Sequence, residues 1–193
     1  MIEPGIGRLL VGSLHGAISD VLPKRLEFYE EWFRPAELRD GHIGRAPLGA
    51  VLSFLRHEGE AYDQVMRQAG TVTATWWVET WSPVLRALMV RMPTWLRGRL
   101  AIREARRLMR HTFRETNVSG RWRQGGGHLT LDHSLFCEVR ERVSHPLCGF
   151  YAAAVETLFA ELRLPVTVSL STCRAVDGAS CTLTLARQAG EAA

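Results

Sequence analysis

The apolar residues of this chain change their spacing near residue 117, and that change limits the fold more than any other feature. Through Glu115 they recur three or four positions apart, which is the period of an amphipathic helix. After Asn117 they alternate with polar residues, which is the period of a half-buried strand. One further helical segment interrupts this alternation. The pattern predicts an α+β fold, with helices packed on one face of a small antiparallel sheet.

Individual helices and strands follow from the same pattern. We expect helices over residues 22–33, 48–70, 71–92, 94–113 and 148–162, with a stop at Gly70 and a kink at Pro83. Strands are expected over residues 118–123 and 128–135, joined by a glycine-rich turn, and over residues 166–171 and 182–185. The two strand pairs predict two hairpins separated by one helix.

The length of 193 residues suits a single domain covering residues 1–193, in which residues 1–70 form an N-terminal helical region. The apolar segment after Arg8 is short and contains His15, so it does not resemble a signal peptide. Uncharged runs such as residues 69–78 are far shorter than the roughly 20 residues that a membrane-spanning helix needs. We therefore expect a cytoplasmic protein without a transmembrane segment, in which thiols stay reduced.

The positive charge of the chain is unevenly distributed. The formal net charge is +4, and arginines concentrate between Arg86 and Arg114. An arginine-rich helix can receive carboxylates or phosphates, a membrane surface, an acidic protein partner or nucleic acid, or it can simply be solvated. Nucleic acid binding is not predicted, because the sequence has neither aromatic stacking motifs nor a known docking module.

Three of the cysteines are expected to converge near the C-terminus. Cys148 opens the predicted helix over residues 148–162, while Cys173 and Cys181 flank a turn that contains Gly178. A hairpin would bring the last two thiols together beside the helix. In a reducing compartment such a group favours either a metal site or an apolar cluster of buried thiols over a disulfide, and the residues alone leave both options open.

Residues 145–151, with the sequence HPLCGFY, begin a pattern that resembles the 4-vinyl-reductase domain. They are followed by an amphipathic helix, a strand that reaches Cys173, a glycine turn and Cys181. Residues 81–109 and the segment Ser119-Gly120-Arg121-Trp122 resemble the bacteriochlorophyll-biosynthesis member of that family, so residues 71–193 form the 4-vinyl-reductase-like region. The resemblance implies a Bet3-like ligand-binding fold, related to phenol-sensor domains, that encloses a hydrophobic ligand. It also implies a link to bacteriochlorophyll biosynthesis and photosynthesis.

The same resemblance implies a zinc site. In the aromatic-sensing relatives, zinc is held by three cysteines that match Cys148, Cys173 and Cys181, together with a glutamate whose position is occupied here by Leu170. A leucine cannot ligate a metal, and a structural zinc ion requires four ligands. We predict that His145, three residues before Cys148, supplies the fourth ligand. Cys137 or a water molecule are the alternatives.

The helical part of the chain contains aromatic and methionine side chains that suit an aromatic or macrocyclic ligand. The candidate ligand-binding residues are Trp76, Trp77, Trp81, Phe54, Met89 and His111, the last as an axial tetrapyrrole ligand. Core packing is the alternative for most of them. Because Trp76 and Trp77 are adjacent in a helix, they cannot both face the same interior.

The sequence shows no complete set of catalytic residues. It contains no serine nucleophile elbow, no phosphate-binding loop and no dinucleotide fingerprint. The leading hypothesis is a binding or carrier protein rather than an enzyme. Its expected ligand is a hydrophobic aromatic or tetrapyrrole molecule rather than a nicotinamide cofactor. The alternatives are a vinyl reductase acting on a chlorophyll precursor and a non-enzymatic interaction or regulatory protein, for instance a homodimer built through exposed helix faces.

Overall fold

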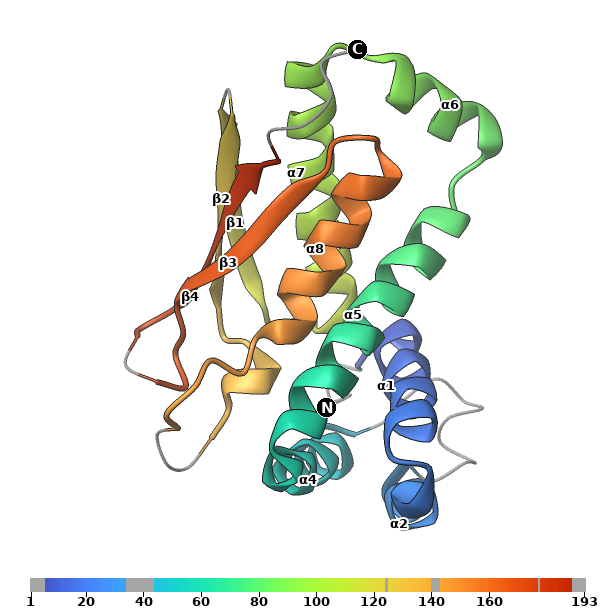
Figure 1. The fold of residues 1–193 in the computed structure, drawn as a ribbon, viewed down its shortest axis with the longest axis vertical. Helices are drawn as coiled ribbons and strands as arrows, with labels where there is room; N and C mark the ends of the chain where they lie inside the picture. The colour runs from blue at the N-terminus through green and yellow to red at the C-terminus, as the bar shows by residue number, and fades with distance from the viewer. Residues whose placement is uncertain (1–5, 34–43, 124, 140–142, 177, 189–193) are drawn as a thin grey trace.

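The protein is described here by a computed structural model, in which residues 6–33, 44–123, 125–139, 143–176 and 178–188 are placed well enough to describe. Its helices are α1 (Arg8–Val21), α2 (Leu26–Phe33), α4 (Arg45–Leu55), α5 (Glu60–Glu79), α6 (Pro83–Arg91), α7 (Thr94–Thr112) and α8 (Gly149–Glu161). Its strands are β1 (Asn117–Arg123), β2 (Gly126–Asp132), β3 (Val166–Thr172) and β4 (Cys181–Arg187). Figure 1 shows these elements in space.

The strands form one antiparallel sheet in the order β1-β2-β4-β3. One face of the sheet is apolar and buried, with side chains that include Val118, Leu129, Leu131, Leu183 and Leu185. Helix α7 packs against β1 and α8 packs against β3, so helices cover this face. The predicted α+β class, with helices on one face of a small antiparallel sheet, is confirmed. Alternation of apolar and polar residues on each strand is the physical reason.

Helix α5 forms the next layer, packed on α8, and α1 packs on α5 in turn (Figure 1). Gly70 lies at the crossing of α5 with α8, where an added Cβ would be 2.2 Å from the carbonyl oxygen of Phe150. The predicted helix stop at Gly70 is therefore wrong, because this glycine permits close backbone contact in the middle of a helix. The predicted division of the chain at residue 70 falls inside α5.

The helix predicted over residues 48–70 is broken at Gly59. This glycine has φ 61° and ψ −123°, a conformation that side-chain-bearing residues avoid, and it separates the short 3-10 turn Arg56–Glu58 from α5. The apolar stripe continues across the break because α4 and α5 face the same core. Helix α1, which buries Leu10, Leu14 and Ile18, was not predicted.

The helix predicted over residues 71–92 is also two helices. Helix α5 ends at Glu79, and Pro83 begins α6 instead of kinking a continuous helix. The Ser82 hydroxyl accepts a hydrogen bond from the Leu85 backbone N–H at 3.3 Å, so Ser82 caps the new helix. The helices predicted over residues 94–113 and 148–162 agree with α7 and α8 to within a residue at each end. None of the helices in the described ranges is both long and apolar enough to span a bilayer.

Candidate functional site

Four cysteines from four different elements meet at one end of α8. Cys137 ends the 3-10 turn Leu135–Cys137, Cys148 lies directly before α8, Cys173 follows β3, and Cys181 begins β4. All four are buried, and their sulfur atoms lie within 4.8 Å of one another. Folding therefore gathers four thiols that are up to 44 residues apart in the sequence.

The spacing of the four sulfur atoms suits a tetrahedral metal site. The Cys137 Sγ is 3.0 Å from that of Cys148 and 3.4 Å from those of Cys173 and Cys181, and the Cys148 and Cys181 sulfurs are 3.3 Å apart. A disulfide would need about 2.05 Å, so all four are free thiols. Zinc–sulfur bonds of about 2.3 Å place tetrahedral sulfur ligands roughly 3.8 Å apart. The group could therefore hold a metal ion after small shifts of the sulfur atoms.

Proton sharing among the thiols divides them into two kinds. Hydrogen bonds from Cys137 and Cys148 lower the pKa of Cys173 and of Cys181. For Cys137, the hydrogen bond with Cys148 lowers the pKa, but the hydrogen bonds with Cys173 and Cys181, together with burial, leave it raised. The hydrogen bond with Cys137 raises the pKa of Cys148. A thiol ligand must be a thiolate, so metal binding at this cluster would displace thiol protons.

Neighbouring groups fix the cysteines in position. The Tyr62 hydroxyl on α5 donates to the Leu147 carbonyl at 2.9 Å, next to Cys148. The Arg174 backbone N–H donates to the Cys181 sulfur at 3.5 Å, and the Ser134 hydroxyl lies 3.4 Å from the Cys148 sulfur. The rings of Phe136, Phe150 and Tyr151 contact one another with centroids 4.9 to 5.4 Å apart and enclose this end of α8 in apolar surface. The site is thus buried and held from several directions.

The structure brings together the three cysteines identified in the sequence, and the fourth member of the group is Cys137 rather than His145. The His145 side chain is exposed and does not belong to the group. Leu170 lies on β3 opposite Leu183, so it has no part in the cluster either. Cys137 follows the end of β2 by five residues, and the 3-10 turn that carries it back to α8 had no recognisable sequence signal.

A pocket of about 730 Å³ lies at the other end of α8. It opens to the surface between the C-terminal ends of α5 and α8 and the helix α6. Its lining combines apolar with charged side chains: Val78, Glu79, Trp81, Pro83, Arg86, Ala87, Val90, Arg91, Glu161 and Arg163. Arg86 forms an ion pair with Glu161 across the pocket. Trp81 is therefore the one predicted ligand-binding residue that lines this pocket.

The other predicted ligand-binding residues are distributed elsewhere. The Trp77 ring contacts that of His111 at 5.3 Å, and His111 is otherwise exposed. Trp76 turns the other way, against Gly12 of α1. Met89 lies on α6, and its side chain is buried.

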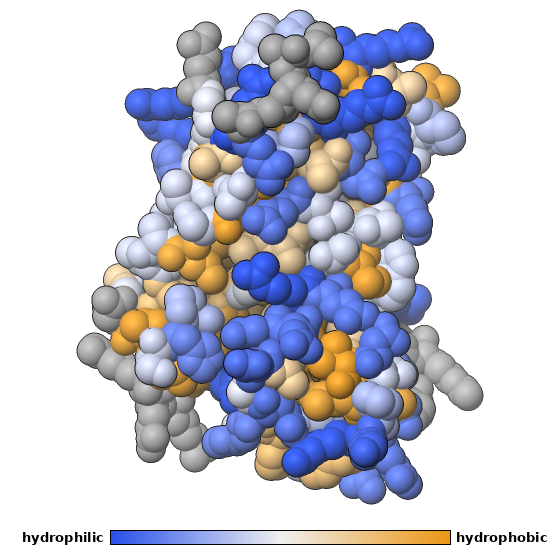
Figure 2. Space-filling model, in the orientation of Figure 1, coloured by the Kyte–Doolittle hydropathy of each residue, from blue (hydrophilic) through white to orange (hydrophobic). Residues whose placement is uncertain are grey.

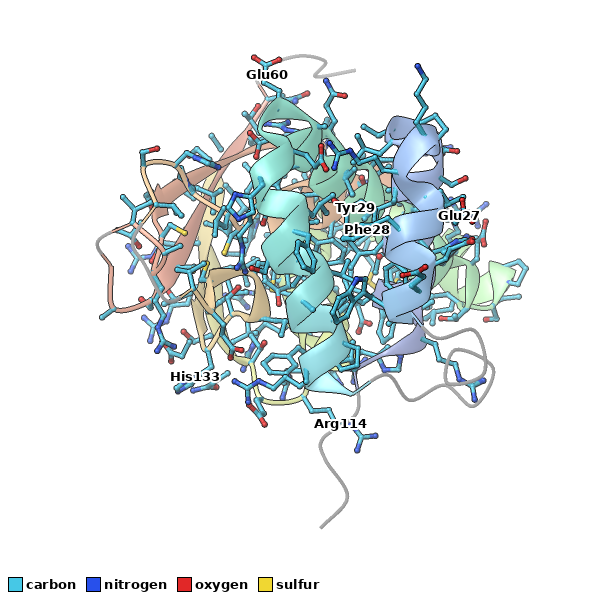
Figure 3. The ribbon with its side chains drawn as sticks, turned by 90° about the horizontal axis from the view of Figure 1, so that it is seen from below. Glu27, Phe28, Tyr29, Glu60, Arg114 and His133 are labelled. Atoms are coloured by element: carbon cyan, nitrogen blue, oxygen red, sulfur yellow. The ribbon has the colours of Figure 1, made fainter. Side chains whose placement is uncertain are left out.

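Phe54 belongs to a separate aromatic cluster between α2 and α4, the α2 cluster, which consists of Phe28, Trp32 and Phe54. The Phe54 ring lies 5.2 Å from that of Phe28 and 5.5 Å from that of Trp32. Figure 3 shows Phe28 on the side of α2 that faces α4. The side chains of Trp76 and Trp77 point in different directions, as their adjacency in a helix predicts. The end of α5 near residue 80 separates these two residues from Trp81 and Met89.

Comparison with known proteins identifies the fold. No family model matches the chain, and no curated protein matches it. Among solved structures, it is similar to the phenol-responsive sensory domain of the transcription activator PoxR in complex with phenol, with 12% identity, a TM-score of 0.55 and 75% of each chain covered. It is also similar to two H-NOX proteins at 10% identity.

One of these is a mutant from K. algicida in the Fe(II) unliganded state, with a TM-score of 0.58 and coverage of 95% of this chain and 97% of that one. The other is from S. oneidensis in the Fe(II)NO ligation state, with a TM-score of 0.52 and coverage of 95% and 99%. These likenesses establish a shared fold. The resemblance to the 4-vinyl-reductase domain stays a prediction from the sequence.

Proposed function

We propose that this protein binds a hydrophobic aromatic small molecule with an anionic group in the pocket beneath α6, and that its four thiols hold a structural zinc ion. The fold supports a binding role, because a protein of the same fold is described as a phenol-responsive sensory domain. Binding rather than catalysis also agrees with the sequence, which contains no recognisable catalytic motif.

The observation that carries the proposal is the combination of side chains in the pocket. Trp81, Val78 and Val90 offer apolar surface for a ring system. Arg91 and Arg163 line the same space without a carboxylate partner among the described residues, so they are available to a carboxylate or similar anion. A volume of about 730 Å³ lies in the usual range for ligand pockets, roughly 300–1,000 Å³. An aromatic acid or a tetrapyrrole with carboxylate side chains has this combination of properties.

The zinc ion would have a structural role. All four ligand positions would be filled by Cys137, Cys148, Cys173 and Cys181, which leaves no open coordination site for substrate or water. A closed site of this kind would tie the start of α8 to the β3–β4 hairpin and to the turn after β2. The protein's ligand would bind at the far end of α8, remote from the metal.

Fluorescence titration with 8-anilinonaphthalene-1-sulfonate, an aromatic anion, tests the pocket. We expect the Trp81→Ala variant to bind this probe about tenfold more weakly or worse, which is a loss of about 1.4 kcal/mol. An Arg91→Gln/Arg163→Gln variant should lose affinity for the anionic probe and keep affinity for the neutral N-phenyl-1-naphthylamine. Trp32→Ala, at an exposed tryptophan of the α2 cluster, is the matched control. Unchanged probe affinity in Trp81→Ala would refute the assignment of this pocket.

Native mass spectrometry of freshly purified protein would identify the natural ligand. We expect a bound mass that matches an aromatic acid or a tetrapyrrole, and one zinc per chain from metal analysis of the same sample. A bacteriochlorophyll precursor would support the link that the sequence resemblance implies. A carrier returns such a precursor unchanged when reduced nicotinamide cofactor is supplied, whereas reduction of its vinyl group would favour the enzyme hypothesis.

A further inference from the structure

Helix α6 exposes an apolar face to solvent. Val84, Leu85 and Leu88 lie on one side of the helix and are 79%, 41% and 54% exposed. Trp95, at the start of α7, is 53% exposed. We call these four residues the apolar tip. Figure 1 shows α6 and the start of α7 at the same outer end of the molecule, and Figure 2 shows apolar residues beside strongly hydrophilic ones there.

The two sides of α6 have different surroundings. The pocket side carries Pro83, Arg86, Ala87, Val90 and Arg91, which recur at helical spacing. The apolar tip lies on the opposite side, and Met89 is the one α6 residue that is buried. A helix side whose large apolar side chains are this exposed offers a surface for another molecule.

The charge around the apolar tip indicates which kind of molecule would bind there. From Thr80 to Arg103 the chain contains no Asp or Glu. Arg99 and Arg103 are exposed and form no ion pair within the described residues, and the Arg99 guanidinium lies over the Trp95 ring at 5.2 Å. A groove of about 430 Å³ beside them, between α7 and β1, adds Arg106, Arg121 and Arg123. A protein surface that binds at the interface of an anionic membrane typically combines these groups: exposed aliphatic side chains, an exposed tryptophan and unpaired arginines.

We propose that the apolar tip docks on an anionic lipid bilayer, with Val84, Leu85, Leu88 and Trp95 entering the interface and Arg99 and Arg103 contacting lipid phosphates. The tip is formed by a helix at the outer end of the molecule, which suits a flat bilayer better than it suits a recess in a partner. A second copy of the chain is less favourable, since a twofold contact would place arginines against arginines. This inference is independent of which ligand fills the pocket.

A second exposed apolar patch on the protein provides a contrast. In the α2 cluster, Phe28, Trp32 and Phe54 are 41%, 37% and 40% exposed. This patch is accompanied on α2 by Glu27, Glu30 and Glu31, which anionic lipids would repel. Apolar exposure is similar at the two sites, and the sign of the neighbouring charge differs. Membrane binding through the tip should therefore depend on both lipid charge and the tip residues.

Vesicle co-sedimentation of the purified full chain tests this proposal. We expect binding to vesicles of phosphatidylcholine with phosphatidylglycerol, weak binding to phosphatidylcholine alone, and release by added salt. Val84→Ser/Leu88→Ser and Arg99→Gln/Arg103→Gln should each weaken binding about tenfold or more. Trp32→Ser, the control at the α2 cluster, should bind like the unaltered protein. Circular dichroism and the probe titration above confirm that each variant is folded and that its pocket is intact.

Three outcomes would overturn the proposal. These are no binding to the anionic vesicles, unchanged binding by the Val84→Ser/Leu88→Ser variant, and equal binding by neutral and anionic vesicles. Sedimentation velocity in the absence of lipid distinguishes the remaining alternative. A dimer that the Val84→Ser/Leu88→Ser variant abolishes, without vesicle binding, would assign the tip to a second copy of the chain.

Discussion

The two ends of α8 are built in opposite ways. At its start, four sulfur atoms from distant parts of the sequence are buried together under a wall of aromatic rings. At its end, α6 crosses over an open pocket and buries little besides Met89, while its outer face remains in water. We propose that the cysteine end maintains the fold and that the α6 end carries the binding surfaces.

Physical principles connect this difference to function. A buried, metal-linked cluster contributes most to global stability because it closes long loops and excludes water. Helices with few buried contacts open at low free energy, which a ligand needs in order to enter and leave. Substitutions at the two ends of α8 should therefore differ in their effect on the free energy of unfolding.

Loss of a cysteine ligand should be the most damaging change. We expect Cys137→Ser and Cys173→Ser each to lose stoichiometric zinc and to lower the free energy of unfolding by about 5 kcal/mol or more, since structural zinc contributes roughly 10–16 kcal/mol in zinc-finger peptides. Metal analysis and urea unfolding measure both effects. His145→Ala is the control and should retain zinc. Full zinc content in Cys137→Ser together with zinc loss in His145→Ala would restore histidine as the fourth ligand.

Apolar truncation should affect the two ends unequally. Phe150→Ala, beside the cysteine cluster, removes a fully buried ring and should cost about 3–4 kcal/mol of unfolding free energy. Leu88→Ala removes an exposed side chain from α6 and should change stability by less than about 0.5 kcal/mol. Urea unfolding of both variants gives the comparison. Similar losses would mean that α6 is as firmly packed as the core.

Alkaline pH should destabilise the core through its tyrosines. Tyr29, Tyr62 and Tyr151 are all buried, and burial raises the pKa of each, for Tyr29 to about 12. Because the folded pKa exceeds the unfolded value of 10.0, the stability from neutral tyrosine is complete below about pH 10 and is lost as pH rises through the folded value. Urea unfolding at about pH 9 and about pH 11 should show this fall, with a smaller fall in Tyr29→Phe. Equal stability at both pH values would contradict burial of these hydroxyls.

The ion pair between Arg86 and Glu161 should have the smallest effect. It joins α6 to the end of α8, but both side chains reach solvent, at 45% and 27% exposure. A double-mutant cycle with Arg86→Gln and Glu161→Gln should give a coupling free energy below about 1 kcal/mol. A much larger coupling would show that α6 is held rigidly over the pocket.

The cysteine end was more predictable from the sequence than the α6 end. Alternating residues defined β3 and β4, and helical spacing defined α8, so three cysteines could be placed together. Cys137 was named as an alternative fourth ligand, but His145 was preferred, because Cys137 reaches the site through a 3-10 turn whose approach depends on tertiary packing. His145 is close to Cys148 in sequence, but its side chain points to solvent.

The α6 end was predicted wrongly because helical spacing of apolar residues does not reveal where one helix ends and the next begins. Pro83 was interpreted as a kink, whereas the Ser82 cap makes it the first residue of a new helix. That error merged α5 with α6 and grouped Trp76, Trp77 and Met89 into one ligand site. Gly70 was misjudged and the break at Gly59 was missed for a related reason, since only the three-dimensional contacts distinguish a glycine that ends a helix from one that lets two helices touch.

X-ray absorption at the zinc edge of the purified protein measures whether the four thiols hold a zinc ion. We expect one zinc per chain with four sulfur neighbours at about 2.3 Å and no nitrogen or oxygen ligand. A folded protein that contains no zinc, or a spectrum that requires an imidazole in place of one sulfur, would contradict a zinc site formed by the four cysteines.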